Sequence, residues 1–143
     1  MDAVFKWQLV FEYLYLGGIL PYFKWMQVIG LVMIFLSLVL FGWARLSLKD
    51  MYSGRLQVKL GHTLVRHGPY RMIRHPAYAA YIIMSLGIAI GYSSLIGLLS
   101  VPLLLIPGLI YRIIVEEKIL AAEFGEQYNH YAERTSRLFP GIW

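Results

Sequence analysis

Long apolar runs separated by short polar stretches dominate the chain. A helix that crosses a bilayer needs roughly 20 mainly apolar residues. Four segments approach that requirement, at residues 4–20, 25–43, 76–92 and 95–115. The first is the weakest, because Lys6 and Glu12 interrupt it. The pattern predicts an all-α integral membrane protein, a helical bundle of three or four transmembrane helices, within one domain over residues 1–143.

The last two apolar segments carry residues that shape helices. Gly87 and Gly91 are four apart, a spacing that permits close approach of another helix. Pro102 and Pro107 lie inside segment 95–115 and are expected to kink or break it. Broken backbone at membrane depth is tolerated only where protein or a cavity covers it. The two segments therefore predict a helical hairpin beside a site.

Two polar regions complete the pattern. The loop from residue 44 to residue 75 holds one acid, Asp50, against seven bases: Arg45, Lys49, Arg55, Lys59, Arg66, Arg71 and Arg74. Basic loops stay in the cytoplasm, so this loop and both termini are expected there. The tail 116–143 has apolar residues at helical spacing and predicts an amphipathic helix.

Composition agrees with this reading and removes several chemistries. The chain is 59% hydrophobic and 15% charged, whereas soluble domains average about 45–50% and about 25%. Its net charge of +5 lies beside apolar segments, which favours membrane lipids over nucleic acid as a partner. The absence of cysteine excludes a disulfide framework, a thiolate metal site and a cysteine nucleophile. The oligomeric state cannot be read from the sequence.

One cluster of polar residues marks the step from the basic loop into the third apolar segment. It runs from Gly61 to Tyr78 and contains three histidines. His75 precedes Pro76, which biases it toward extended backbone at a helix N-terminus. Such a corner can hold a carboxylate or a polar cofactor head group. The alternative is a basic, aromatic turn that only touches lipid head groups.

A second cluster follows the fourth apolar segment. Arg112 and Glu116 are four residues apart and share one helix face, next to Glu117. Ionisable groups at a membrane boundary are usually functional. The alternative is a helix-end ion pair with Glu117 as solvated charge.

Metal and hydrolase chemistry fit the sequence poorly. His62, His67 and His75 lack the helical spacing of a zinc motif. No Gly-x-Ser-x-Gly elbow appears, and Asp2 and Asp50 are the chain's aspartates. We therefore expect no metal site.

Taken together, the motifs resemble the isoprenylcysteine carboxyl methyltransferase family, which is related to phospholipid methyltransferases. The resemblance covers roughly residues 61–140 and depends on the order and spacing of five short motifs. They are His62-Thr63-Leu64-Val65, Gly68-x-Tyr70, Arg74-His75-Pro76-x-Tyr78, Arg112-x-x-x-Glu116-Glu117 and Phe124-Gly125-x-x-Tyr128-x-x-Tyr131, before a closing Arg137-Leu138-Phe139-Pro140.

The resemblance implies an S-adenosylmethionine-dependent methyltransferase whose cofactor pocket is capped by the cytoplasmic loop and the C-terminal helix. Arg112 and Glu116 would face a lipid-like acceptor that enters from the bilayer. The residues implied to bind the cofactor are His62, Thr63, Leu64, Val65, Tyr70, His75, Pro76, Ala77, Tyr78 and Glu117.

Three functions remain open from the residues. A carboxylate acceptor needs a fixed cation, which Arg112 can supply bidentately. An amine acceptor of a phospholipid needs a base, which Glu116 can supply. The third is a non-catalytic membrane interaction module.

Overall fold

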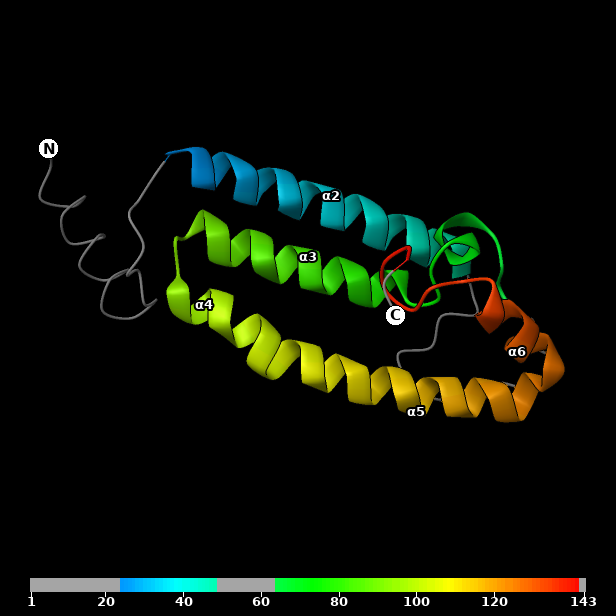
Figure 1. Ribbon diagram of the computed structural model, residues 1–143. Helices are drawn as coiled ribbons and strands as arrows, with labels where there is room; N and C mark the ends of the chain where they lie inside the picture. Colours follow the sequence, from blue (N-terminus) through cyan, green and yellow to red (C-terminus); the bar gives the residue numbers. More distant parts are fainter. Residues whose placement is uncertain (1–23, 49–63, 142–143) are drawn as a thin grey trace, which may run out of the picture. The chain divides into compact units, whose positions relative to one another are not determined.

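The computed structural model describes residues 24–48 and 64–141, and this part of the chain is helical (Figure 1). Segment 4–20, His62 and Thr63 lie outside the described residues. The elements are α2 (Lys24–Leu48), the 3₁₀ turn η2 (Gly68–Arg71), α3 (Pro76–Gly91), α4 (Leu95–Ser100), the π-helical turn η3 (Val101–Leu105), α5 (Ile106–Phe124) and α6 (Glu126–Glu133). The predicted all-α class is confirmed.

Two of the helical stretches are long and apolar enough to cross a membrane. They are α2 and the continuous run Leu95–Phe124 that joins α4, η3 and α5. The 25 residues of α2 span about 37 Å, more than the roughly 30 Å hydrocarbon core. The 16 residues of α3 span only about 24 Å. Both helices extend beyond the spans predicted at 25–43 and 95–115, because they continue into polar sequence.

The apolar side chains of α2 are exposed. Trp25 is 77% exposed, Leu31 67% and Phe35 65%. In water so large an apolar surface would be unfavourable at about 25 cal/mol per Å². The same surface carries no such free-energy cost when it faces lipid tails, which agrees with the membrane-spanning role predicted for this segment.

The helix containing the two prolines is not broken, and the disturbance expected there takes the form of a π-helical turn. Pro102 lies in η3, where the amide of Ile106 bonds to the carbonyl of Val101, five residues back. The wider π turn accommodates a residue without an amide hydrogen while the chain stays helical. Pro107 follows at the start of α5, which continues without interruption to Phe124.

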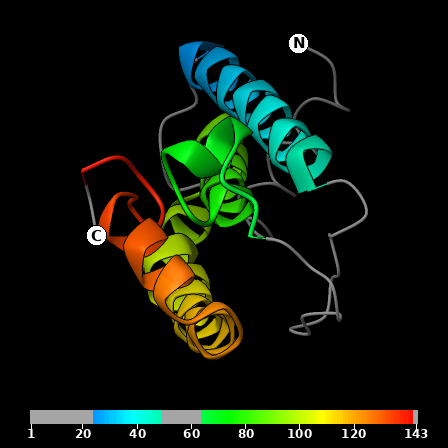
Figure 2. The ribbon, with the colours of Figure 1, turned by 90° about the vertical axis from the view of Figure 1, so that its right-hand side faces the viewer.

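The tail is also not the single amphipathic helix that its spacing predicted. α5 extends to Phe124, and Gly125 then adopts φ 54° and ψ −128° before α6 begins. This backbone conformation is essentially restricted to glycine. The reversal carries α6 back from the end of α5 (Figure 2).

The described residues divide into two compact units. The first takes residues 24–37 and 82–107. Here α2 and α3 run antiparallel and approach so closely that a Cβ on Gly30 would lie 2.5 Å from the carbonyl oxygen of Gly87 and 2.7 Å from the Cα of Gly91 (Figure 1). The close approach expected from Gly87 and Gly91 is confirmed, and its partner is a third glycine.

The second unit takes residues 38–48, 64–81 and 108–141. It contains the first turns of α3, most of α5, and α6. Ile113 of α5 is fully buried in it, and Tyr128, Tyr131 and Leu138 are nearly so. Both polar clusters predicted to carry chemistry fall in this unit.

Candidate functional site

The backbone corner at His75 opens the candidate site. Pro76 begins α3, and the carbonyl of His75 accepts the first helical hydrogen bonds from the amides of Tyr78 and Ala79, each at 3.1 Å. Pro76 needs no acceptor, since it has no amide hydrogen. The corner expected from the His75-Pro76 step is present. The His75 side chain is 4% exposed.

The C-terminal segment pairs with this corner through its backbone. The amide of Arg74 donates to Ser136 O at 2.8 Å, and the amide of His75 donates to Arg137 O at 3.0 Å. In return Ser136 donates to Met72 O at 3.2 Å. A short parallel bridge between Ile73 and Ser136 results. Backbone hydrogen bonds from the C-terminal segment therefore hold the corner in place.

Glu117 on α5 is the ionic centre of the site. Its Oε1 accepts from Arg74 Nε and its Oε2 from Arg137 Nε, both at 2.9 Å. His75 Nε2 lies 3.4 Å from Oε1. The Glu117 side chain is only 12% exposed, so its charge is compensated by two guanidinium groups rather than by water.

Arg74 also binds the backbone of the C-terminal segment. Its Nη1 donates to Ala132 O at 2.7 Å and to the carbonyl oxygen of Thr135. One guanidinium thus joins α5 to one carbonyl in the last turn of α6 and to another just after that helix. The planar fork of arginine allows these bonds to point in different directions at once.

A second group of residues, which includes Glu116 next to Glu117, surrounds Tyr78. The Tyr78 hydroxyl donates to Glu116 Oε2 at 2.8 Å. Its ring stacks on His75, with centroids 5.6 Å apart and an interplanar angle of 16°. The guanidinium carbon of Arg112 lies 5.9 Å from the same ring's centroid. Glu116 Oε2 is 3.9 Å from His75 Nδ1.

Two tyrosines of α6, Tyr128 and Tyr131, are buried in this unit. The Tyr131 hydroxyl donates to Tyr70 O at 2.7 Å. Burial raises the pKa of Tyr131 to about 12, although the positive charge of Arg74 opposes this. Burial, reinforced by the negative charge of Glu117, also raises the pKa of Tyr128 well above its ordinary value.

Two buried polar atoms of this unit have no hydrogen-bond partner within the described residues. They are His75 Nε2 and the Tyr128 hydroxyl. His75 Nε2 lies 3.4 Å from Glu117 Oε1 without hydrogen-bond geometry. Buried polar groups are nearly always paired, so such atoms commonly mark a place where a polar ligand binds.

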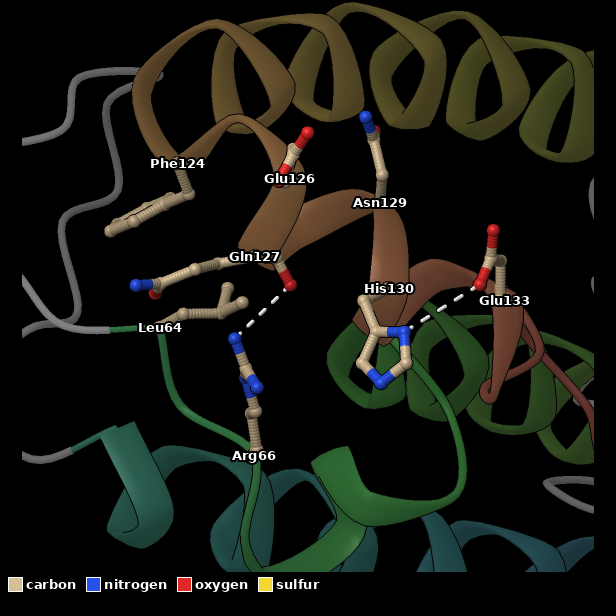
Figure 3. Close-up of a pocket in the computed structure, with 8 residues that line it drawn as sticks. All are labelled: Leu64, Arg66, Phe124, Glu126, Gln127, Asn129, His130 and Glu133. Carbon is tan, nitrogen blue, oxygen red and sulfur yellow. Dashed lines mark hydrogen bonds and ion pairs between the residues drawn. The ribbon is translucent and has the colours of Figure 1, made fainter.

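An open polar groove of about 1060 Å³ lies between α6 and residues 64–66 of the basic loop (Figure 3). Arg66 spans it, donating from Nη2 to Gln127 O at 3.1 Å. His130 Nδ1 lies 3.7 Å from Glu133 Oε2. The lining residues are Leu64, Arg66, Phe124, Glu126, Gln127, Asn129, His130 and Glu133.

The structure brings only part of the predicted set together. Five residues meet at the first turns of α3 and the middle of α5: His75, Tyr78, Arg112, Glu116 and Glu117. Leu64 instead lines the groove. Tyr70 and Pro76 are buried, and Val65 and Ala77 are partly exposed.

Sequence reasoning missed two participants. Arg74 and Arg137 lay within quoted motifs, yet no role was assigned to them. The available signal was Glu117 itself, because a carboxylate that follows an apolar run needs a cation beside it.

Comparison with known proteins decides the family. The model of the family described as phospholipid methyltransferase matches residues 25–127. The chain belongs to the phospholipid methyltransferase family. This match takes in all of α2 except Lys24, and it includes Tyr78, Glu116 and Glu117, whereas Arg137 lies beyond it.

Curated relatives of this phospholipid methyltransferase family member carry a more specific name. Protein-S-isoprenylcysteine O-methyltransferase of Tribolium castaneum is 31% identical over 145 residues, which cover 98% of this chain and 50% of that protein. Protein-S-isoprenylcysteine O-methyltransferase A of Arabidopsis thaliana is 28% identical over 120 residues, covering 82% of this chain and 61% of its own length. The chain thus spans about half to three fifths of these relatives.

A solved structure supports the membrane assignment. The eukaryotic intramembrane Ras methyltransferase ICMT (isoprenylcysteine carboxyl methyltransferase) superposes with a TM-score of 0.80 and 29% identity, over 98% of this chain and 51% of that one. With its apolar helices, this family member is an integral membrane protein.

Proposed function

We propose that this chain is an S-adenosylmethionine-dependent methyltransferase that esterifies a carboxylate on an isoprenoid or lipid-like substrate. The observation that carries the proposal is the placement of Arg112. Its guanidinium lies at the Tyr78 ring, one helical turn from Glu116, where α5 leaves its apolar part. The names of the relatives and of the superposed structure agree with this chemistry.

A carboxylate acceptor requires position more than activation. It is already nucleophilic, so no general base is needed, and a guanidinium can fix both of its oxygens. Arg112 is proposed to bind the acceptor in this way. Glu116 places a negative charge on the same helix face and restricts where the Arg112 guanidinium can settle.

The residues of the second unit fit a nucleoside cofactor bearing an amino acid. When bound, S-adenosylmethionine supplies a methyl group on a sulfonium as the electrophile. The groove offers amides and carboxylates for polar groups and Phe124 for an apolar ring, in a volume at the upper end of the roughly 300–1,000 Å³ usual for ligand pockets. Leu64 is proposed to line it, with His62, Thr63 and Val65 as its neighbours in the chain.

The His75 corner would hold the amino acid end of the cofactor. His75 Nε2 and the Tyr128 hydroxyl are buried polar atoms with no hydrogen-bond partner in the part of the chain that the structure describes. Tyr70, Pro76 and Ala77 are proposed to line the same corner. Each oxygen of Glu117 can accept a second hydrogen bond beyond its guanidinium, so this carboxylate remains able to receive an ammonium.

The acceptor is proposed to reach Arg112 from the lipid side. Arg112 and Tyr111 are both exposed on α5, with Tyr111 72% exposed. Side chains at that level of an apolar helix meet the head-group region of a bilayer. The basic loop between residues 44 and 75 supports a cytoplasmic location for this end of the protein and for the proposed site.

An amine acceptor is the second candidate function. The matching family is described as phospholipid methyltransferase, and Glu116 lies on the face of α5 proposed to meet the acceptor. A phosphoethanolamine nitrogen must lose a proton before it attacks, and Glu116 would take it. In this reaction Arg112 would bind the lipid phosphate instead.

One experiment separates these functions. Purified protein in lipid nanodiscs is incubated with methyl-labelled S-adenosylmethionine and either a prenylated cysteine acid or a phosphatidylethanolamine. Label on the acid that mild base releases supports the carboxyl ester. Base-stable label on the phospholipid supports the amine. Protein that neither transfers label nor binds the cofactor by calorimetry would be a membrane interaction module.

A further inference from the structure

The Tyr78 side chain contacts both groups proposed to meet the acceptor. Its hydroxyl donates to Glu116 Oε2 at 2.8 Å, and its ring lies 5.9 Å from the guanidinium carbon of Arg112. Arg112 and Glu116 are flexible side chains on α5, whereas Tyr78 belongs to the first turn of α3. A single rigid ring from another helix thus meets an acid and a base that lie one turn apart.

Tyr78 is itself held from two further sides. It stacks on the buried His75 ring, and Tyr81 tilts against it with centroids 6.5 Å apart. Tyr81 in turn packs on Phe41 of α2 at 5.5 Å. Because these rings are packed, the Tyr78 hydroxyl has little freedom to follow a moving carboxylate. The hydrogen bond therefore requires the Glu116 carboxylate to take a position that the Tyr78 hydroxyl sets.

From this geometry we propose that Tyr78 is a positioning residue that acts through Glu116 and Arg112. The hydroxyl fixes one oxygen of Glu116, and the ring face attracts the Arg112 guanidinium. The acceptor then meets a cation whose place is already set, which lowers the entropy lost on reaching a reactive geometry. This role rests on the proposed methyl transfer, and it differs from the cofactor-lining role that the sequence resemblance implied for Tyr78.

The two contacts can be removed separately. Tyr78→Phe keeps the ring, its stacking on His75 and its contact with Arg112, and loses only the bond to Glu116. A hydrogen bond to a charged group is typically worth about 1.5–3 kcal/mol, which corresponds to about 10- to 100-fold in rate. Tyr78→Leu removes the ring as well and should lower the rate further.

Tyr81→Phe is the matched control. It deletes a phenol hydroxyl from the same helix, three residues away, and leaves the ring packing on Phe41. Nothing in the proposed site depends on that hydroxyl. This variant should transfer methyl groups at the wild-type rate.

The test is steady-state methyl transfer in nanodiscs, together with calorimetry of S-adenosylmethionine binding. We expect Tyr78→Phe to lose about 10- to 100-fold in kcat while cofactor affinity stays within about twofold. In a Glu116→Ala background the same change should have little further effect, because the acceptor of the Tyr78 hydroxyl is already removed. A purely structural tyrosine would instead lower stability and both kinetic constants in either background.

The outcomes distinguish the two proposals. If the wild-type protein transfers methyl groups and Tyr78→Phe is equally fast, the positioning role is wrong and the proposed function stands. The role is also wrong if Tyr78→Phe loses cofactor affinity in parallel with rate. If the wild-type protein transfers to neither acceptor, the proposed function fails, and the role that rests on it fails with it.

Discussion

Arg137 Nε donates to Glu117 Oε2 at 2.9 Å, joining residues that are 20 positions apart in the sequence. With Arg74 on the other carboxylate oxygen, this bond ties the end of the chain to the middle of α5. The same C-terminal segment pairs through its backbone with the His75 corner. Glu117 therefore adds to the backbone bonds that hold the corner and the C-terminal segment together.

We expect Glu117→Gln to loosen this segment. The amide removes the negative charge from between two guanidinium groups and replaces an acceptor oxygen by a donor. Breaking a buried ion pair from one side typically destabilises by about 3–5 kcal/mol. Hydrogen exchange measured by mass spectrometry should then show faster exchange in peptides covering residues 70–76 and 132–138.

Glu123→Gln supplies the control for that measurement. It removes the same charge from α5 at an exposed position. Exchange in both peptides should match the wild-type protein. Equal exchange in the two variants would show that Glu117 is not what holds the segment.

The contrast between Glu117 and His75 shows how far local sequence pattern reaches. The His75-Pro76 step specifies its own backbone, because proline restricts the residue before it. The expected corner at the start of α3 is accordingly present. Arg74 and Glu117 are 43 positions apart, and no helical period relates them. Which of the arginines contacts the Glu117 carboxylate depends on the tertiary fold.

The same distinction explains the corrected helices. Apolar periodicity continues from Phe124 through Tyr128 and Tyr131, so the tail read as one helix. The reversal depends on the positive φ of Gly125, which periodicity does not record. At Pro102 the sequence correctly marked a disturbed turn. The π-helical solution arises from bonds that reach five residues back, a choice that depends on packing rather than composition.

A second prediction concerns the closest approach of α2 and α3. In Gly30→Ala the new Cβ would lie 2.5 Å from the Gly87 carbonyl oxygen, so the two backbones must separate. Forcing extra volume into packed helices typically destabilises by about 1–3 kcal/mol. We expect a lower midpoint for unfolding in a denaturing-detergent titration.

Gly42→Ala is the control on the same helix, because a Cβ there meets nothing within 4 Å. Gly42→Ala should be neutral or stabilising, since alanine favours helix over glycine by about 1 kcal/mol. Loss of stability in both variants would point to the glycines' flexibility rather than to their contact.

A third prediction concerns alkaline pH. The pKa of Tyr131 is raised to about 12 in the folded protein, whereas an exposed phenol loses its proton near pH 10. The folded state therefore keeps a proton that the unfolded state releases. This contribution to stability is complete below about pH 10 and is lost as the pH rises toward 12. Tyr128, whose pKa is also raised, adds to the same trend.

The free energy of unfolding should accordingly fall between pH 9.5 and pH 11, by up to about 1.4 kcal/mol per pH unit for each phenol. Tyr131→Phe should have a shallower slope and, at neutral pH, a stability lower by about 1 kcal/mol for its lost bond to Tyr70 O. A slope unchanged by Tyr131→Phe would assign the alkaline loss to other groups.

The last prediction concerns Arg112, on which the proposed acceptor chemistry depends. Arg112→Ala removes the guanidinium from the Tyr78 ring and from the face shared with Glu116. Without a cation to fix it, a carboxylate loses a charge-assisted bidentate contact, and we expect methyl transfer to fall by at least about 100-fold. Arg112→Lys should recover little, because an ammonium cannot bind both oxygens in one plane.

Lys118→Ala, at an exposed position of α5, is the matched loss of positive charge and should leave the rate unchanged. The decisive comparison is cofactor affinity, which should be the same in all four proteins. If Arg112→Ala loses cofactor affinity together with transfer, Arg112 belongs to the cofactor site, and another cation must be found for the acceptor.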